Sequence, residues 1–264
     1  MDIKDKYNVE ETVLGYGGFG VVYAGTRKSD GQKVAVKMVK KKYLSATMIE
    51  DDIPLEVKLL QAVQNVPGII TFYDYFATSN AYYIVMEQME GTDLFQFISA
   101  RGPLEENIAV NIFKQVIDAL IECQNHNVHH GDVKDDNILI NQVGQEVMIK
   151  LIDMGSGTWY SANTVMTENS GARVYSPPEW IVSEEYYQEA FTVWNLGILL
   201  YYILCGNLPF EEDVEIIYGE LMWPIPISFN AKDLVIKCLN KCQKSRLTLQ
   251  QVVNHPWLVP IQTH

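Results

Sequence analysis

The sequence predicts an α+β protein with two lobes, a small β-rich lobe followed by a larger helical lobe. Strand-like segments and turn signals occupy most of residues 1–90, and helical patterns dominate from Leu94 onward. At about 100–200 residues per domain, 264 residues make one large domain or two small lobes. We expect a single domain over 1–264, divided into an N-lobe (1–87), a hinge (88–93) and a C-lobe (94–264).

The N-lobe is expected to begin as an antiparallel meander of three strands around a glycine-rich turn. The strands are predicted at residues 7–14, 21–26 and 33–39. A helix follows, with Pro54 in its first turn and apolar residues on one face. This helix is predicted at 53–63, and two more strands at 69–76 and 82–88.

The C-lobe is expected to be mainly helical. Amphipathic or apolar helices are predicted at residues 94–99, 105–124, 189–204, 231–240 and 248–254. The longest apolar run extends from Leu196 to Cys205. A bilayer span takes ~20 residues, so we interpret this run as a buried helix.

Composition narrows the classes of function. The chain is 48% hydrophobic, and 20 basic against 33 acidic residues give a net charge of −13. This balance disfavours nucleic-acid binding and docking on anionic membranes, which need excess Lys and Arg. It is compatible with a cationic partner or simply with solubility. The four cysteines form no zinc pattern, and the N-terminus has no apolar leader, so we expect a cytoplasmic and/or nuclear protein with reduced thiols.

A glycine-rich segment near the N-terminus is a candidate phosphate loop. The sequence GYGGFGVV at residues 15–22 fits G-x-G-x-x-G-x-V. By itself it could equally be a dinucleotide-binding loop or a plain hairpin. A dinucleotide loop should open a helix, whereas here a second strand follows. The sequence VAVK then places Lys37 on an apolar strand, which favours a phosphate ligand over a surface lysine.

A second charged residue is a candidate partner for this lysine. A buried lysine needs a counter-charge, and a helix carboxylate could hold it toward the phosphates. We choose Glu56, which lies beside apolar positions in the sequence PLEV, over the acidic residues just before it.

The strongest signal is the sequence HHGDVKDDN at residues 129–137, followed by an apolar run and then by Asp153-Met154-Gly155. It fits H-x-D-x-x-x-x-N. One carboxylate can accept the proton of a substrate hydroxyl, a second can hold Mg²⁺, and the Asn137 amide oxygen can complete the metal site. An acidic surface loop does not explain this ordered set, and the three nearby histidines lack the spacing of a zinc site.

In their order, these motifs resemble the protein kinase family over about residues 8–258. Within that family the chain is most similar to the PIM serine/threonine kinases. The specific matches are LIDMGSG at 151–157, RVYSPPEW at 173–180, LGILLY at 196–201 and NHPW at 254–257. The resemblance implies the bilobal protein-kinase fold, with a small β-rich N-lobe and a larger helical C-lobe. It also implies ATP- and Mg²⁺-dependent phosphorylation of Ser and Thr in proteins or peptides.

The resemblance implies a role for each matching residue. Asp132 orients and deprotonates the acceptor hydroxyl, and Lys134 steadies the transferring phosphate. Lys37, held by Glu56, binds the α- and β-phosphates. The implied Mg²⁺ ligands are Asn137 and Asp153. The implied nucleotide contacts are the loop glycines Gly15, Gly17 and Gly20, the adenine sandwich of Leu14, Val22, Ala35 and Leu139, the gatekeeper Met86, the hinge residues Glu87 and Met89, and the ribose or substrate contact Asp93.

Several residues depart from the family pattern. The hinge lacks the proline and the extra residue of PIM kinases, so the Met89 amide can donate a hydrogen bond to adenine. Gly131 stands in place of Arg, and Met154 in place of Phe. Thr192 replaces a bracing Asp, as in PIM kinases, and Ala172 replaces a Thr near the catalytic base. These departures keep an alternative open: a pseudokinase that binds ATP or serves as a scaffold with little turnover.

The expected function is nevertheless an active kinase that works as a monomer. Gly131 cannot pair with a phosphate, so we expect activity without phosphorylation of the activation segment, although that segment offers Thr158, Tyr160, Ser161, Thr164, Thr167 and Ser170. Asp93 and Asp136 match positions that read upstream arginines, so basic substrates are expected. The resemblance also implies an ion pair between Glu179 and Arg246.

Overall fold

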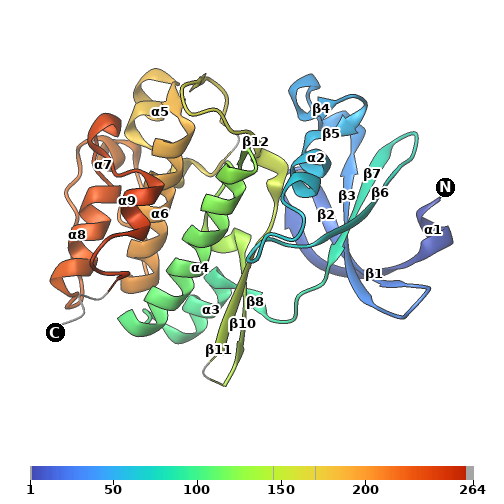
Figure 1. The fold of residues 1–264 in the computed structure, drawn as a ribbon, viewed down its shortest axis with the longest axis horizontal. Coiled ribbons are helices and arrows are strands. Elements are labelled where there is room, and N and C mark those ends of the chain that lie inside the picture. The colour runs from blue at the N-terminus through green and yellow to red at the C-terminus, as the bar shows by residue number, and fades with distance from the viewer. Residues whose placement is uncertain (1, 145, 170, 260–264) are drawn as a thin grey trace.

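The computed structural model describes residues 2–144, 146–169 and 171–259, and it has two lobes (Figure 1). A short helix, α1 (Ile3–Lys6), precedes a five-stranded antiparallel sheet of order β1-β2-β3-β7-β6. Its strands are β1 (Tyr7–Gly17), β2 (Gly20–Arg27), β3 (Lys33–Lys40), β6 (Phe72–Ala77) and β7 (Ala81–Glu87). The predicted meander is confirmed, and the glycine-rich turn joins β1 to β2.

The helix of the N-lobe is shorter than predicted. Helix α2 covers Leu55–Ala62, because Pro54 has a ψ of 132° and precedes the helix as its N-cap instead of lying in its first turn. The residues just before the helix form a hairpin of β4 (Ile49–Glu50) and β5 (Ile53–Pro54). Strand β6 also starts later than predicted, at Phe72, because the backbone just before it pairs with Leu151 of the other lobe.

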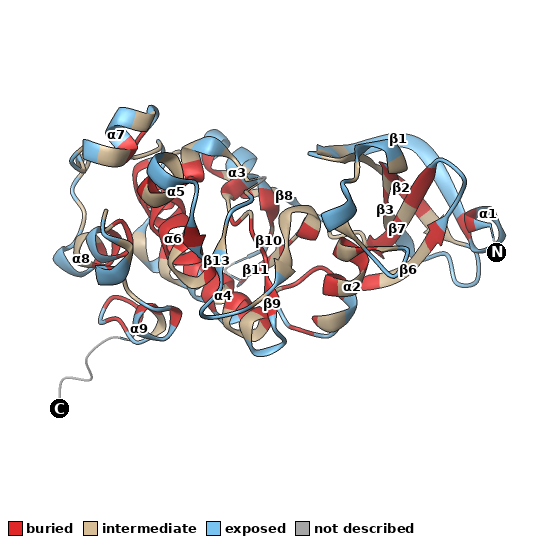
Figure 2. Cartoon of the chain, turned by 90° about the horizontal axis from the view of Figure 1, so that it is seen from above, coloured by how far each residue is buried: buried red, intermediate tan, exposed pale blue. Residues whose placement is uncertain are grey.

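The C-lobe is built around two long helices. Helices α4 (Glu106–Asn125) and α6 (Gln188–Cys205) carry much of its core, and Figure 2 shows buried residues along both. The apolar run predicted as a buried helix lies within α6. The other helices are α3 (Leu94–Arg101), α5 (Pro178–Ser183), α7 (Asp213–Tyr218), α8 (Phe229–Cys238) and α9 (Leu249–Val253). The sequence analysis had not identified α5 and α7.

Short strands in the C-lobe arrange the loops that face the N-lobe. The hairpin β10 (Ile138–Val143) and β11 (Glu146–Leu151) follows the HHGDVKDDN segment and was not predicted. The other short strands are β8 (Thr92–Asp93), β9 (Val128–His129), β12 (Thr158–Trp159), β13 (Val165–Met166) and β14 (Tyr186–Tyr187). Strand β8 ends the hinge and pairs with β10. Within the described ranges, no helix is long and apolar enough to cross a membrane.

Candidate active site

A buried lysine joins the two lobes. Lys37 on β3 is 2% exposed, and its Nζ lies 2.6 Å from Glu56 Oε1 and 2.6 Å from Asp153 Oδ1. The predicted pair of Lys37 and Glu56 is therefore present. Asp153 comes from the segment after β11, so the same ammonium group connects strand β3, helix α2 and the C-lobe.

Within this cluster, Lys37 and Asp153 stabilise each other's charge. Burial alone would lower the pKa of Lys37, but attraction by Glu56 and Asp153 raises it above its ordinary value. Burial would raise the pKa of Asp153, but the Lys37 charge and a hydrogen bond from the Gly155 amide hold it below its usual range. For Glu56, burial dominates and raises the pKa. Lys37 is therefore cationic and Asp153 anionic at neutral pH.

A second cluster surrounds Asp132. Its Oδ2 lies 3.0 Å from Lys134 Nζ and accepts a hydrogen bond of 2.8 Å from the Asn137 amide. Its Oδ1 accepts a hydrogen bond of 3.3 Å from the backbone N–H of Ala172. Ala172 thus contacts the carboxylate through its backbone, although it lacks the hydroxyl that most kinases have at this position.

The loop before Asp132 is held by a histidine. The backbone N–H of Asp132 points at His130 Nδ1 at 3.4 Å, and His130 Nε2 lies 3.1 Å from the Ile152 carbonyl oxygen. This assigns the N–H to Nε2, which donates to Ile152. Burial lowers the pKa of His130, so the ring is neutral. His130 thereby joins the Asp132 loop to the strand that leads into Asp153.

The residues near both clusters fit a phosphate-bound Mg²⁺ ion. The Asn137 side-chain amide donates hydrogen bonds to the Asp132 carbonyl oxygen and to the Asp132 carboxylate. Its Oδ1 has no hydrogen-bond partner among the described residues. Asp153 engages Lys37 and Gly155 through Oδ1. Its Oδ2 faces Gly17, where a β-carbon would lie 3.0 Å away. Asp153 Oδ2 therefore faces a gap that a side chain at position 17 would fill. This oxygen and Asn137 Oδ1 are hard donors of the kind that Mg²⁺ prefers.

The predicted adenine contacts come from both lobes. Val22 lies opposite Lys37 in the sheet, Ala35 lies opposite the buried Met86, and Leu139 lies opposite Asp93. Leu14 is 44% exposed on β1, in the same strand as Gly15 and Gly17. Gly20 starts β2, opposite Gly17. The strand pairing thus places Val22, Ala35 and Met86 on neighbouring strands of the N-lobe sheet, and Leu139 beside the end of the hinge.

The hinge residues have structural partners that the sequence analysis did not identify. The Glu87 carboxylate forms an ion pair with Lys150 Nζ at 2.8 Å and accepts a hydrogen bond from the Thr71 N–H at 3.1 Å. The Asp93 carboxylate caps helix α3, accepting hydrogen bonds from the backbone and the side chain of Gln96. The spacing of Asp93 and Gln96 resembles a capping box, a signal that could have revealed this role.

The activation segment, from Asp153 to Glu179, is tied down at several points. The implied pair is present: Arg246 contacts Glu179 through two nitrogens, at 2.7 and 2.9 Å. The Trp159 indole N–H donates to Glu50 Oε2 at 2.8 Å, and Arg173 pairs with Asp213 at 2.7 Å. The sequence analysis missed these last two contacts. Ser170, one of the hydroxyl residues noted above, lies outside the described residues.

Comparisons with known proteins agree with this geometry. A family model described as "Protein kinase domain" matches residues 7–258. The chain is 39% identical to the serine/threonine-protein kinase pim-2 of Danio rerio over 94% of this chain and 83% of the relative. It is 36% identical to prk-2 of Caenorhabditis elegans, covering 93% of this chain and 56% of that protein. It is 34% identical to calcium-dependent protein kinase 14 of Arabidopsis thaliana, covering 97% and 50%. The chain thus spans about half the length of these last two relatives.

Proposed function

The chain belongs to the protein kinase family and is a serine/threonine protein kinase similar to the PIM kinases, and on this premise we propose how it works. It transfers the γ-phosphate of ATP to Ser and Thr hydroxyls in proteins or peptides. It prefers basic sequence contexts, and its activation segment needs no phosphorylation. The observation that carries the proposal is the double ion pair of Lys37 with Glu56 and Asp153, next to the Asp132 cluster.

Protein kinases use ATP, typically with Mg²⁺. Residues of both clusters contribute to binding the phosphates and the metal ion. Lys37 binds the α- and β-phosphates, with Glu56 holding its ammonium group in place. Asn137 and Asp153 offer their free oxygens to the metal. Bound Mg²⁺ would neutralise phosphate charge. Because these groups are fixed before substrate arrives, little reorganisation is needed during the reaction.

Asp132 receives the proton of the acceptor hydroxyl. Hydrogen bonds from Asn137 and Ala172 orient its carboxylate, and Lys134 stands beside it to meet the charge of the transferring phosphoryl group. The oxygen–phosphorus bond to the acceptor forms while the bond to the leaving ADP oxygen breaks. The proton moves from the hydroxyl to the Asp132 carboxylate.

The entrance between the lobes is proposed to hold the adenine ring. Leu14, Val22, Ala35 and Leu139 supply its apolar walls, and Met86 closes the inner end. The N–H of Met89 donates to no acceptor among the described residues, so it is available to adenine. The Glu87 carbonyl oxygen is proposed as the second hinge contact.

A preference for basic substrates is supported by carboxylates near the acceptor site. The Asp136 side chain reaches solvent but is partly desolvated by its neighbours. This desolvation and the repulsion from Asp93 and Asp132 raise its pKa, against attraction by Lys134. Neighbouring carboxylates that repel one another gain from a cationic partner. Arg side chains suit them because the guanidinium group can bind a carboxylate at two points. Asp213, by contrast, is already paired with Arg173.

Independence of activation-segment phosphorylation is supported by contacts that do not involve phosphate. Gly131 offers no side chain for a phosphate, and Arg173 of the segment is paired with Asp213. Trp159 ties the segment to Glu50, and Gln188 donates to the Trp159 carbonyl oxygen at 3.0 Å. These contacts hold the segment against both lobes. We therefore expect phosphatase treatment to leave phosphoryl transfer unchanged, and loss of activity would contradict this part of the proposal.

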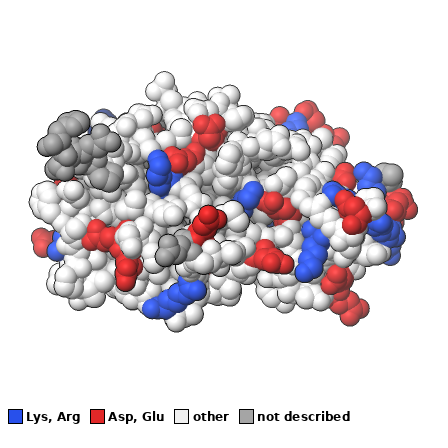
Figure 3. Space-filling view, turned by 60° about the horizontal axis from the view of Figure 1, so that its bottom comes forward, with Lys and Arg blue, Asp and Glu red and all other residues white. Residues whose placement is uncertain are grey.

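The remaining features of the proposal concern partners. We propose that the kinase acts as a monomer on protein or peptide substrates in the cytoplasm and/or nucleus, with one domain over residues 1–264, and that it binds neither nucleic acid nor membrane. Lys and Arg side chains lie scattered among Asp and Glu on the face drawn in Figure 3. Scattered charge of this kind gives little attraction to a polyanion.

A positional-scanning peptide library tests the substrate preference. Peptides with Arg or Lys upstream of the acceptor should rank first, and Asp93→Ala combined with Asp136→Ala should flatten that ranking. The proposal is wrong if acidic or proline-directed peptides rank first, or if the double variant leaves the ranking unchanged. ATP binding without turnover on any peptide would instead favour the pseudokinase alternative.

A further inference from the structure

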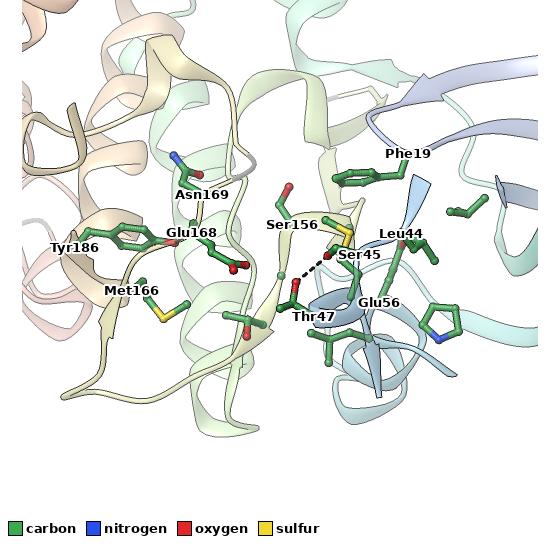
Figure 4. A pocket seen from close by; sticks show the side chains of 17 residues that line it. Phe19, Leu44, Ser45, Thr47, Glu56, Ser156, Met166, Glu168, Asn169 and Tyr186 are labelled. Carbon is green, nitrogen blue, oxygen red and sulfur yellow. Dashed lines mark hydrogen bonds between the residues drawn. The ribbon is translucent and has the colours of Figure 1, made fainter. Parts of the chain in front are cut away.

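A cavity of about 280 Å³ lies beside the proposed transfer site, and most of the residues that line it have no role in the function described above. One wall comes from the glycine-rich turn, the segment before α2 and the start of α2. The other wall comes from the activation segment and β14 (Figure 4). Pockets that enclose a whole small molecule are usually about 300–1,000 Å³. This cavity lies at the lower end of that range and has room for a single long side chain.

The cavity adjoins the reacting groups. Gly155, which donates to Asp153, lies in its lining. So does Asn169, whose Oδ1 accepts a hydrogen bond from the Gly171 amide, and a β-carbon at Gly171 would lie 3.2 Å from Asp132 Oδ1. A peptide whose acceptor hydroxyl meets Asp132 therefore passes close to the mouth of the cavity.

The residues that line the cavity disfavour the binding of an anion. The described residues that line it include Glu56 and Glu168 but no lysine, arginine or histidine. Glu56 is neutralised by Lys37, whereas the Glu168 carboxylate is exposed and points into the gap between the walls in Figure 4. Hydroxyl groups of Ser45, Thr47 and Ser156 add hydrogen-bonding capacity. A cationic group would therefore find a carboxylate and hydroxyl groups in this cavity, whereas a phosphate or carboxylate would find no positively charged side chain among the described lining residues.

The apolar part of the lining suits an aliphatic stem. Phe19 and Leu44 on one wall and Met166 and Tyr186 on the other supply apolar surface around the polar groups. Lys and Arg bury their methylene stems on such surface and keep the charged head near a carboxylate. The lining thus offers apolar surface for the methylene stem of a long basic side chain and a carboxylate for its charged head.

The position of the cavity decides which part of a substrate can reach it. Asp93, proposed to read residues upstream of the acceptor, lies on β8, and β8 and β12 lie at opposite ends of the junction between the lobes in Figure 1. Thr158 of β12 lines the cavity. An extended peptide that meets Asp93 on one side of Asp132 therefore directs its downstream residues to the other side.

We propose that this cavity, with Glu168 at its charged centre, binds an Arg or Lys side chain located within a few residues downstream of the acceptor Ser or Thr. The inference rests on the proposed function, since it names a second element of substrate recognition by the same enzyme. It makes the kinase responsive to basic residues on both sides of the acceptor.

Matched peptides test the proposal. All carry the same upstream arginines, and they differ in a single Arg, Ala or Glu at the second, third or fourth residue after the acceptor. In the unmodified enzyme, Arg at the best position should raise kcat/KM about five-fold over Ala, as a partly exposed ion pair allows. Glu168→Gln should remove this gain without changing kcat/KM for the Ala peptide. Glu168→Lys should make the Glu peptide better than the Arg peptide.

Glu220→Gln, an equal charge change at an exposed residue outside the lining, should keep the gain from downstream Arg. The proposal is overturned if downstream Arg gives no gain, or if Glu168→Gln preserves it. Anisotropy of the same peptides, fluorescently labelled, measures binding directly. Failure of phosphoryl transfer on every peptide would contradict the proposed function, while the difference in binding between the unmodified protein and Glu168→Gln would still decide for or against the cavity.

Discussion

Gly131, the residue before the catalytic Asp132, packs directly against the backbone of Ser156 in the activation segment. Its φ is +80°, and a β-carbon built on it would overlap the Ser156 carbonyl oxygen. An L-residue at this position would meet two penalties, the left-handed backbone and the steric clash. The glycine therefore sets how closely the catalytic loop and the segment after Asp153 approach each other.

Gly131→Ala should disturb this contact. The clash cannot be relieved by a side-chain rotation, because both partners are backbone or β-carbon atoms. We expect a loss of about 2 kcal/mol in the free energy of unfolding and a fall in kcat of at least ten-fold. Gly31→Ala is the matched control, since Gly31 has a φ of +75° but open space around a β-carbon. Equal effects of the two substitutions in urea unfolding and in turnover would contradict the account.

Substitution of the charged cluster should abolish phosphoryl transfer without unfolding the protein. Lys37→Met removes the phosphate ligand, and Asp153→Asn removes the metal carboxylate. Electrostatic groups of this kind contribute about 10²–10³ in rate each. Glu56 can take up a proton when its partner is lost, because burial raises its pKa. Circular dichroism should remain unchanged, and the exposed Lys33→Met serves as control. Near-normal turnover in Lys37→Met would show that the site is wrongly assigned.

The contact between Trp159 and Glu50 should hold helix α2 in its working position. Glu50 also pairs with Lys58 of that helix, at 3.1 Å, so one carboxylate joins the activation segment to the element that carries Glu56. Trp159→Phe keeps an aromatic ring and deletes the N–H donor. A hydrogen bond to a charged acceptor contributes about 1 kcal/mol or more, so amides of α2 should exchange with solvent about five-fold faster.

The turnover of Trp159→Phe should fall several-fold at saturating ATP. Glu50→Gln, which keeps an acceptor for the indole but loses the charge, should give a smaller effect on exchange. Unchanged amide exchange of α2 in Trp159→Phe would contradict the prediction that this contact holds α2 in position.

Stability should decrease in mild acid because of a buried neutral histidine. Burial lowers the pKa of His129 to about 3, with a smaller contribution from His130. In the unfolded chain a histidine titrates near 6.5, so below that pH the unfolded state binds the extra proton. The free energy of unfolding should therefore fall as the pH drops from about 6.5 toward 3, by up to about 1.4 kcal/mol per pH unit for this group.

His129→Phe should flatten that slope. The substitution removes one long hydrogen bond, of 3.4 Å between His129 Nδ1 and Thr192 Oγ1, whereas His129 Nε2 has no hydrogen-bond partner among the described residues. The comparison is urea unfolding between pH 7 and pH 4.5, with the exposed His126→Gln as control. A slope that is the same in the parent protein and in His129→Phe would contradict the prediction.

Most of the fold could be predicted from the sequence because the segments concerned have clear local patterns. The turn at residues 15–22 and the apolar strand around Lys37 are local patterns, and the PLEV sequence was sufficient to choose Glu56. The hairpin of β10 and β11 was missed, although its alternating pattern around Gly144 offered a signal. The contact between Trp159 and Glu50 joins residues 109 positions apart. No local pattern encodes such a contact, which depends on how the lobes and the activation segment pack together.

Transfer of labelled phosphate from ATP to an arginine-rich peptide, in the presence of Mg²⁺, tests the central claim most directly. The purified protein and its Asp132→Asn variant are compared after phosphatase treatment. The variant keeps the size of the side chain but loses the carboxylate that accepts the proton. We expect phosphorylation on Ser or Thr by the parent protein and a loss of at least about 10² in kcat for the variant. Equal, background-level incorporation by both proteins would contradict it.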